Sequence, residues 1–258
     1  MSKENILAIS SVDLSARQHW ARATIKVDLH IHTCASKDGG VHPADVIKAA
    51  RRKGLDRICI TDHNTIDGAL VAKKIDPDFV IIGEEILTRH GEILAFFVND
   101  WVPPRLSHQE TIDRLVDQGA VISVSHPFDR HRNQPWTEEL LQAVLARLDA
   151  VEGFNARTIH PEDNEKASVF AAAHNLPTTA GSDAHTAMEI GAAYLEMPAF
   201  TTAEEFRAGL AQAKIQGRLS PMWVHFFSRL NAWRTRFGLK PKINQPETMS
   251  RNKLLINK

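Results

Sequence analysis

VDLHIHTCASKDGG, residues 27–40, combines an alternating strand pattern with a pair of histidines. Apolar residues at positions 25, 27, 29 and 31 alternate with polar ones, which predicts a β-strand. Side chains two residues apart lie on the same face of a strand, so His30 and His32 project side by side. The glycine pair marks a loop and puts Asp38 just beyond the strand. The stretch is either the first half of a metal site or a buried strand whose histidines bind the backbone.

Other predicted strands also end in potential metal ligands. Strands over residues 57–61, 79–83, 120–125 and 177–180 precede His63, Glu85, His126, and Asp183 with His185. Helices of about ten residues alternate with the strands, over residues 43–53, 66–74, 107–119, 137–148, 161–174 and 202–214. This alternation predicts about seven βα units around a parallel sheet, with residues 79–98 also consistent with a hairpin. The carboxyl ends of barrel strands form one face, where the histidines could meet.

Length and composition indicate a soluble, cytoplasmic protein. The 258 residues suit a one-domain α/β barrel, and the formal net charge of zero gives no support for an obligate nucleic-acid or membrane partner. Cys34 and Cys59 are too few for a disulfide framework, so we expect free thiols that are buried or near the site. Residues 1–24 lack the pattern of a signal peptide, and no apolar run approaches the ~20 residues of a transmembrane helix.

Three segments are predicted: a polar extension over residues 1–23, a catalytic barrel over 24–217, and a basic extension over 218–258. The last segment holds nine basic residues against one acid, Glu247. Apolar residues recur there at three- and four-residue steps, which predicts an amphipathic helix over residues 221–237. We favour a helix that packs its aromatic face on the barrel or on a second subunit. The alternative is contact with a membrane surface or with nucleic acid.

The candidate ligands share nitrogen or oxygen donor atoms. They are His30, His32, Asp38, His63, Glu85, His126, Asp183 and His185. Such donors suit zinc, manganese or iron, and their number matches two or three ions, with Glu85 available as a bridge. Asp28 and Asp62 are expected to orient imidazoles through the second ring nitrogen, although Asp62 could instead cap its loop.

Five short motifs together resemble the PHP family, the polymerase and histidinol phosphatase domain. They are DLHIHT (28–33), TDHN (61–64), GEE (83–85), SHPF (125–128) and GSDAH (181–185), in the order in which the family has them. The resemblance covers roughly residues 25–200. It implies a distorted TIM-like barrel of seven βα units, a trinuclear metal centre and hydrolysis of a phosphate ester.

The resemblance also implies how the ligands divide among the ions. His30, His32, Glu85 and Asp183 would surround one ion, Asp38, His63 and His185 a second, and His126 would help to complete a third. This chain departs from the family's Ser-Asp-Gly pattern because Lys37 is inserted before Asp38. Many members carry a further histidine after the glutamate motif. The candidates at that place are His90 and Glu92, of which Glu92 fits the start of the next strand better.

The implied chemistry is attack on phosphorus by a hydroxide that bridges two ions, since bound cations lower the pKa of water to ~7 from ~15.7. Arg130 and Arg132 are placed to bind the phosphate, with Arg89 and Lys37 as secondary candidates. The substrate would be a small phosphorylated molecule or a nucleotide. The alternatives are a phosphodiesterase or exonuclease that binds nucleic acid through the basic tail, an amidohydrolase, and a non-catalytic metal-binding accessory module.

Overall fold

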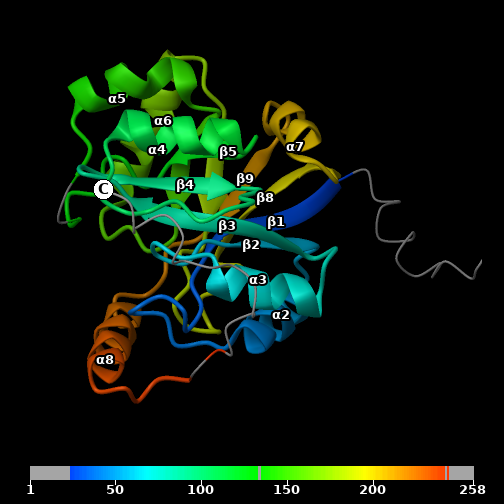
Figure 1. Cartoon of the computed structure of the whole chain (residues 1–258). Coiled ribbons are helices and arrows are strands. Elements are labelled where there is room, and N and C mark those ends of the chain that lie inside the picture. Colours follow the sequence, from blue (N-terminus) through cyan, green and yellow to red (C-terminus); the bar gives the residue numbers. More distant parts are fainter. Residues whose placement is uncertain (1–23, 133–134, 242, 244–258) are drawn as a thin grey trace, which may run out of the picture.

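A curved sheet of nine strands forms the centre of the protein in the computed structural model (Figure 1). The structure describes residues 24–132, 135–241 and 243. The sheet order is β7-β6-β5-β4-β3-β2-β1-β8-β9. The strands are β1 (Thr24–Ile31), β2 (Arg57–Ile60), β3 (Val80–Leu87), β4 (Glu92–Phe96), β5 (Val121–Val124), β6 (Ala150–Asn155), β7 (Thr178–Gly181), β8 (Ala193–Pro198) and β9 (Lys214–Gly217).

The sheet curls until its ends almost meet. The end of β1 lies next to the chain that follows β7. Ile31, the last residue of β1, forms a parallel bridge with Ala184, and the His32 N–H donates to the Ala184 carbonyl at 2.9 Å. The predicted α/β barrel-like fold is therefore confirmed. β1, β2 and β3 form one parallel group, and β5, β6 and β7 form another. Because β4 is antiparallel to both β3 and β5, the two groups run in the same direction, and the carboxyl ends of their strands share one rim.

The strand directions differ from seven repeated βα units. β3 and β4 form an antiparallel hairpin, as the alternative for residues 79–98 predicted, and β4 is also antiparallel to β5. Thr88 donates its N–H to the Gly91 carbonyl across the turn, and Gly91 has a φ of +71° that favours glycine. β8 and β9 extend the sheet in antiparallel fashion beyond β1. The hairpin matters for the site because Glu85 and Glu92 lie on its two strands.

Helices surround the curved sheet (Figure 1). They are α2 (Pro43–Arg52), α3 (Asp67–Ile75), α4 (His108–Asp117), α5 (Glu138–Val144), α6 (Pro161–Ala173), α7 (Ala203–Leu210) and α8 (Val224–Arg236). Ser107 caps α4 in a capping box with Glu110, as its spacing predicted. The helix predicted over residues 202–214 ends sooner, at Leu210, and the chain continues into β9, which was not predicted. Apolar side chains of β1, β3, β4 and β5 pack with those of α7 in one core cluster.

The C-terminal helix forms, but its aromatic face does not pack on the barrel. Val224 and Asn231 are its buried residues, whereas Phe226 and Trp233 are 65% and 52% exposed. Polar side chains instead attach α8 to the barrel. Ser228 Oγ accepts a hydrogen bond from Arg157 at 2.7 Å, and Thr235 Oγ1 donates to the Lys37 carbonyl. Of the two predicted partners of the aromatic face, the barrel was wrong, because the periodicity of a helix does not reveal which face is covered. Packing on a second subunit stays a prediction.

Two further predictions have different outcomes. Cys34 and Cys59 are both free and buried, as expected. The three-segment division stays a prediction, and its extension at residues 1–23, like residues 244–258, falls outside the described residues. Within the described part of the chain, every helix is too short or too polar to cross a bilayer.

Candidate metal centre

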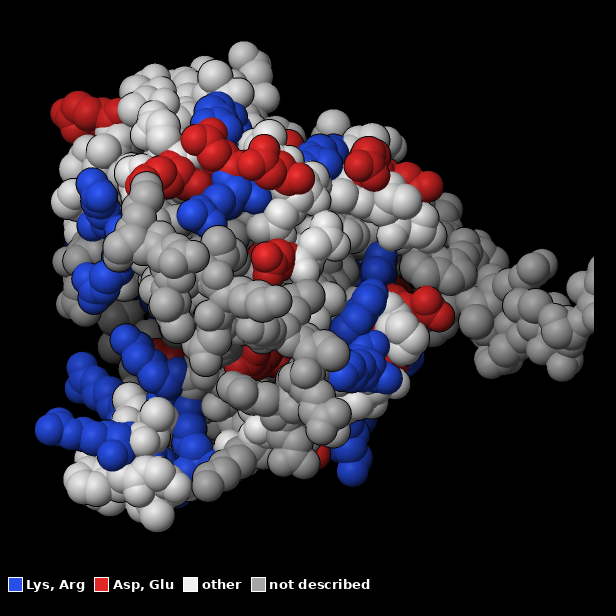
Figure 2. Space-filling view, in the orientation of Figure 1, with Lys and Arg blue, Asp and Glu red and all other residues white. Residues whose placement is uncertain are grey.

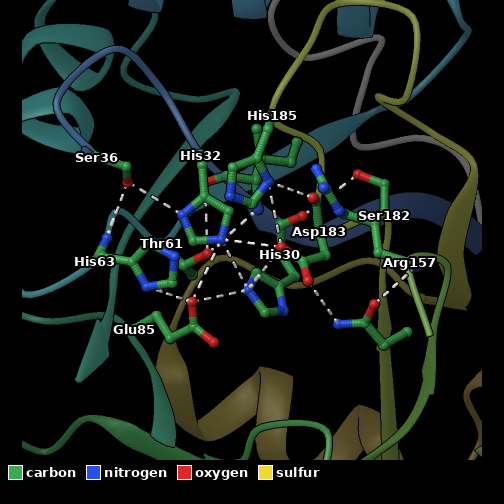
Figure 3. Close-up of polar contacts among 12 residues, drawn as sticks. His30, His32, Ser36, Thr61, His63, Glu85, Arg157, Ser182, Asp183 and His185 are labelled. Atoms are coloured by element: carbon green, nitrogen blue, oxygen red, sulfur yellow. Dashed lines mark hydrogen bonds and ion pairs between the residues drawn. The ribbon is translucent and has the colours of Figure 1, made fainter. Parts of the chain in front are cut away.

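Five imidazoles converge at the rim formed by the strand ends, and Figure 3 labels four of them: His30, His32, His63 and His185. The list is His30, His32, His63, His126 and His185, from β1 and the loops after β2, β5 and β7. The ring nitrogens Nε2 of His30 and His32 are 3.1 Å apart, so the adjacent pair faces one point as predicted. The His32 ring centroid lies 4.4 Å from that of His63 and 4.3 Å from that of His185. Histidines from three parts of the chain therefore share one small volume.

Glu85 lies at the centre of this cluster. Its Oε2 is 2.9 Å from His63 Nδ1 and 3.3 Å from Nε2 of both His30 and His32. Its Oε1 is 2.9 Å from His126 Nε2 and also accepts a hydrogen bond from the Ser125 hydroxyl. One carboxylate thus reaches histidines on both sides of the cluster, which is the arrangement expected of a bridging ligand.

Asp183 and Asp38 approach the histidines from the opposite side. Asp183 Oδ1 is 3.1 Å from His32 Nε2 and 3.5 Å from His185 Nδ1. Asp38 Oδ1 is 3.5 Å from His185 Nε2 and 3.7 Å from His63 Nε2. The extra residue at Lys37 therefore does not keep Asp38 away from the cluster.

Three carboxylate oxygens in the cluster are buried without accepting a hydrogen bond from any described residue. They are Asp38 Oδ1, Glu85 Oε2 and Asp183 Oδ1. A buried polar atom without a hydrogen bond costs about 1–3 kcal/mol, and more when it is charged. Divalent cations would satisfy all three oxygens, and the surrounding imidazoles are ligands of the same kind. Three groups of donors within the cluster are each compact enough to hold an ion: His32, His63 and His185; His30, His32 and Glu85; and His63, Glu85 and Glu92. His32, His63 and Glu85 each belong to two of these groups.

Electrostatics keep the carboxylates of the cluster ionised but shift the pKa values of its imidazoles in opposite directions. Burial opposes ionisation of Glu85 and Asp183, but charge on the neighbouring His30 outweighs it and holds the pKa of both carboxyls well below its usual range. Burial lowers the pKa of His32 well below its ordinary value, and the proximity of His185 and His63 lowers it further. Burial opposes protonation of His30 and His63 as well, but Glu85 and Asp183 raise the pKa of His30 well above its ordinary value, and Glu85 and Asp38 raise that of His63 to about 10. Metal binding therefore requires these two imidazoles to lose their protons.

The backbone bends sharply where it presents two of these side chains. His126 has a φ of 26° and Asp183 a φ of 51°, in the left-handed region that non-glycine residues seldom adopt. Both residues follow directly on strand ends, and such strain concentrates at functional sites. Gly181, two residues before Asp183, has no space for a side chain, because a Cβ there would lie 2.2 Å from His30 Cβ. The close approach of β7 to β1 therefore depends on glycine at this position.

Glu152 on β6 is a component of the site that the sequence interpretation missed. Its Oε1 lies 2.8 Å from His30 Nδ1, and its Oε2 accepts the His126 N–H at 2.8 Å. A carboxylate that holds the second nitrogen of a metal-binding imidazole fixes the orientation of the ring. The signal was present in the sequence as a single acid within the apolar strand AVEGFN (150–155).

The Glu152→Gln protein is therefore expected to bind metal ~10–100-fold more weakly than wild type, because the amide orients His30 less strongly. Titration of the chelator-treated protein with Zn²⁺ or Mn²⁺, followed by calorimetry, measures this change. The matched control is Glu165→Gln on α6, which removes an acid from an exposed part of the same βα unit. Equal affinities of the Glu152→Gln and wild-type proteins would contradict the orienting role.

Asp28 and Asp62 lie beside the cluster, but the prediction that they contact imidazole rings directly was wrong. Asp28 accepts backbone hydrogen bonds from Ser182 and Gly191 at 2.9 Å each, and burial raises its pKa to about 6. Asp62 Oδ1 accepts from the Ser36 hydroxyl at 2.7 Å, and Ser36 Oγ is 3.1 Å from His32 Nδ1. Asp62 thus supports His32 through Ser36, whereas Asp28 ties β1 to the loop after β7.

The two arginine candidates have different positions. Arg132 donates to Asp183 Oδ2 at 2.8 Å and to Asp129 Oδ2 at 3.1 Å, which places its guanidinium at the edge of the cluster. Arg130 pairs instead with Asp163 of α6 at 2.6 Å and its side chain is half exposed. The expectation that Arg130 faces the phosphate is not supported by this geometry.

The two candidates for an additional ligand, Glu92 and His90, lie in different places. Glu92 lies in the cluster, with Oε1 3.7 Å from His63 Nδ1 and Oε2 3.5 Å from His126 Nε2. His90 is exposed and stacks on His108, where its carbonyl contacts the His108 ring nitrogen. The preference for Glu92 over His90 agrees with these positions.

The barrel-like fold brings histidines and carboxylates together in groups that could hold metal ions. Residues 28–98 match the PHP domain, and residues 161–215 match the PHP-associated segment. One uncharacterised protein of Methanocaldococcus jannaschii is 38% identical over an alignment that covers 51% of this chain and 82% of the relative. A second uncharacterised protein of the same organism is 34% identical over 67% of this chain and 70% of the relative. The chain belongs to the PHP domain family. A probable phosphatase of Enterobacter sp. strain 638 is 26% identical over 64% of this chain and 80% of its own.

Solved structures share the fold. A protein assigned provisionally as a metal-dependent phosphoesterase, from Bifidobacterium adolescentis, aligns with a TM-score of 0.53 at 21% identity over 62% of this chain and 87% of its own. PsfC from Pseudomonas syringae aligns with a TM-score of 0.60 at 18% identity over 84% and 99% of the two chains. A lesion-specific endonuclease from Pyrococcus furiosus aligns with a TM-score of 0.55 at 14% identity over 87% and 73%. Family membership and the phosphatase relative support a metal-dependent phosphoesterase in general.

Proposed function

We propose that the protein hydrolyses the phosphate monoester of a small molecule or a nucleotide in a centre that holds two or three divalent ions. The observation that carries the proposal is a set of three buried carboxylate oxygens, on Asp38, Glu85 and Asp183. Each lies close to imidazole rings but accepts no hydrogen bond from the described residues. Zinc, manganese and iron all accept such a mixed set of nitrogen and oxygen donors.

The donor groups suggest how three ions would be held. His30, His32, Glu85 and Asp183 would bind the first ion, and Asp38, His63 and His185 the second. His126 and Glu92 would hold the third, with Glu85 shared between ions. When bound, the ions would lower the pKa of water and stabilise charge on the phosphate oxygens.

The side chains of the protein would position the substrate. Most of the cluster is buried, but the side chains of Asp38, His63 and Glu92 are 20%, 11% and 15% exposed, and so mark the side from which a phosphate can enter. The Arg132 side chain, 27% exposed, contacts Asp183 at the edge of the cluster. Its planar guanidinium suits two phosphate oxygens, and Asp129 would hold it in place while the ester is bound.

Hydrolysis of p-nitrophenyl phosphate tests the proposal. The purified protein is expected to release p-nitrophenol, to lose this activity after thorough chelation, and to regain it with Zn²⁺, Mn²⁺ or Fe²⁺ measured in separate assays. The His63→Ala protein should remain inactive under all conditions because an ion loses its ligand. Activity that persists in the metal-free protein would overturn the proposal.

A diester substrate is the alternative with a phosphate centre of the same kind. Bis(p-nitrophenyl) phosphate and a single-stranded oligonucleotide, assayed with the same protein and metals, distinguish the two. Cleavage of these diesters without cleavage of the monoester would replace the proposed reaction by the diesterase one. Metal binding without any hydrolysis of esters would instead favour an accessory module.

A further inference from the structure

Helix α8 and the residues that flank it present a strip of apolar side chains to the outside of the protein. Of the eleven large apolar side chains that are exposed in the part of the chain that the structure describes, seven lie within residues 222–239. They are Met222, Trp223, Phe226, Phe227, Trp233, Phe237 and Leu239. Ring centroids of Trp223 and Phe227 are 5.7 Å apart, and those of Trp233 and Phe237 are 4.8 Å apart, so the side chains touch along the helix. Exposed apolar patches of this kind mark interaction surfaces.

Four residues of the strip lie opposite the polar face that attaches the helix to the barrel. At 100° per residue, positions 224, 228, 231 and 235 share one face, and 222, 226, 233 and 237 share the opposite one. Hydrogen bonds at Ser228 and Thr235 fix the polar face against Arg157 and the loop at Lys37. The helix is therefore amphipathic with its apolar side outward, the reverse of a helix that covers a core.

Basic residues border the strip and acidic ones are absent. Residues 218–242 include Arg218, Arg229, Arg234, Arg236, Lys240 and Lys242 but no Asp or Glu. Figure 2 shows blue side chains around white ones on the lobe at lower left, where α8 lies in Figure 1. Arg229 and Arg236 are exposed on one border, and Arg234 is exposed on the other. The surface is thus complementary to a partner that is both apolar and negatively charged.

These features distinguish among possible partners. A second copy of α8 would bring like charges together without acids to offset them. Single-stranded nucleic acid stacks its bases on aromatic rings within a basic groove, whereas Phe226 and Trp233 are exposed on the outer face of a helix. An anionic bilayer accepts the apolar strip at the boundary of headgroups and acyl chains, while arginines at the border reach the lipid phosphates.

We propose that α8 is an interfacial helix that docks the protein on an anionic lipid surface. This goes beyond the phosphoesterase activity and does not depend on it. The helix is held to the loop that carries Asp38, because Thr235 Oγ1 donates to the Lys37 carbonyl and Lys240 Nζ donates to the Ser36 carbonyl. Docking through α8 would therefore keep one edge of the candidate metal centre next to the lipid surface.

Sedimentation of the full chain with large vesicles tests the docking. The protein is expected to pellet with vesicles of phosphatidylcholine that contain about 30% phosphatidylglycerol, in about 0.1 M NaCl, and its tryptophan emission should shift to shorter wavelength. Binding should weaken in about 0.5 M NaCl and on vesicles of phosphatidylcholine alone, since the arginines act through charge.

Two pairs of substitutions separate the apolar and basic contributions. The Phe226→Ser/Trp233→Ser protein should bind at least ~10-fold more weakly because it loses two large apolar side chains from the strip. The Arg229→Gln/Arg236→Gln protein should lose about fivefold in affinity for each arginine, and its salt dependence should decrease. Matched controls are Val169→Ser on α6 and Arg52→Gln on α2, both exposed and outside α8, which should bind as wild type does.

Four outcomes would overturn the proposal. The first is failure of the wild-type protein to pellet with anionic vesicles at low salt, and the second is an equal loss of binding in the control variants. The third is a wild-type dimer that does not bind vesicles and dissociates on the Phe226→Ser/Trp233→Ser change. The fourth is a wild-type protein that does not bind vesicles but binds a single-stranded oligonucleotide through the strip. The third outcome would assign the strip to a second copy of the chain, and the fourth to nucleic acid.

Discussion

The Glu85→Gln protein is expected to purify with less bound metal than wild type and to lose phosphoesterase activity well beyond the ~10–100-fold typical of residues that only orient a ligand. Glu85 is buried among His30, His32, His63 and His126, and its two oxygens reach histidines on both sides of the cluster. The amide keeps the volume of the side chain but removes its charge and one acceptor oxygen. Metal analysis together with kcat/KM for p-nitrophenyl phosphate measures the result.

Glu84→Gln is the matched control for this change. Glu84 is the preceding residue of β3 and equally buried, but its Oε2 accepts the Val102 N–H outside the cluster. The control should retain wild-type metal content because it alters no donor atom of the cluster. Full activity and metal content in the Glu85→Gln protein would show that Glu85 is not a ligand.

Removal of metal should lower the thermal stability of the protein. Metal at about 100 times its dissociation constant stabilises a folded protein by about 2.7 kcal/mol. For a chain of this size, that corresponds to a decrease in Tm of about 5–10 °C after chelation. The physical reason is that Asp38, Glu85 and Asp183 each keep a buried oxygen that accepts no hydrogen bond from the described residues. Differential scanning calorimetry with and without added Zn²⁺ or Mn²⁺ measures the shift.

The Glu85→Gln protein supplies the control for the thermal experiment. Its Tm should respond much less to metal than that of wild type, whereas the Glu84→Gln protein should respond fully. A wild-type Tm that is unaffected by chelation and by every added metal would contradict a cation-binding cluster, whatever the activity measurements show.

The sequence predicted the parts of the fold that depend on local patterns. Strand ends at His32, His63, His126 and Asp183 were recognisable because short apolar runs stop at polar residues. β9 was not recognisable, since Lys214–Gly217 is polar and mostly exposed, and pairs only with β8. Direction was also ambiguous: alternating strands and helices favour a parallel sheet, and only the turn at residues 88–91 indicated the antiparallel hairpin.

The candidate site was predictable where a donor follows a strand and less so where it lies within one. Glu152 escaped notice because one acid in a buried strand gives no spacing pattern. Arg130 and Arg132 could not be separated from sequence, since two residues in a loop differ only through partners such as Asp163. Packing of the α8 aromatic face on the barrel was predicted wrongly, because an amphipathic pattern is identical whether its apolar side faces a core or solvent.

The bridge between Ile31 and Ala184 has a consequence for the order of events during folding. It joins residues 153 positions apart, so forming it requires closure of a long loop, which is slow for entropic reasons. His30 and His32 leave the ribosome early, but Asp183 and His185 are synthesised about 150 residues later. The nascent chain therefore carries an incomplete set of ligands through most of its synthesis. We expect tight metal capture to be among the last steps of maturation, after the two ends of the sheet have come together.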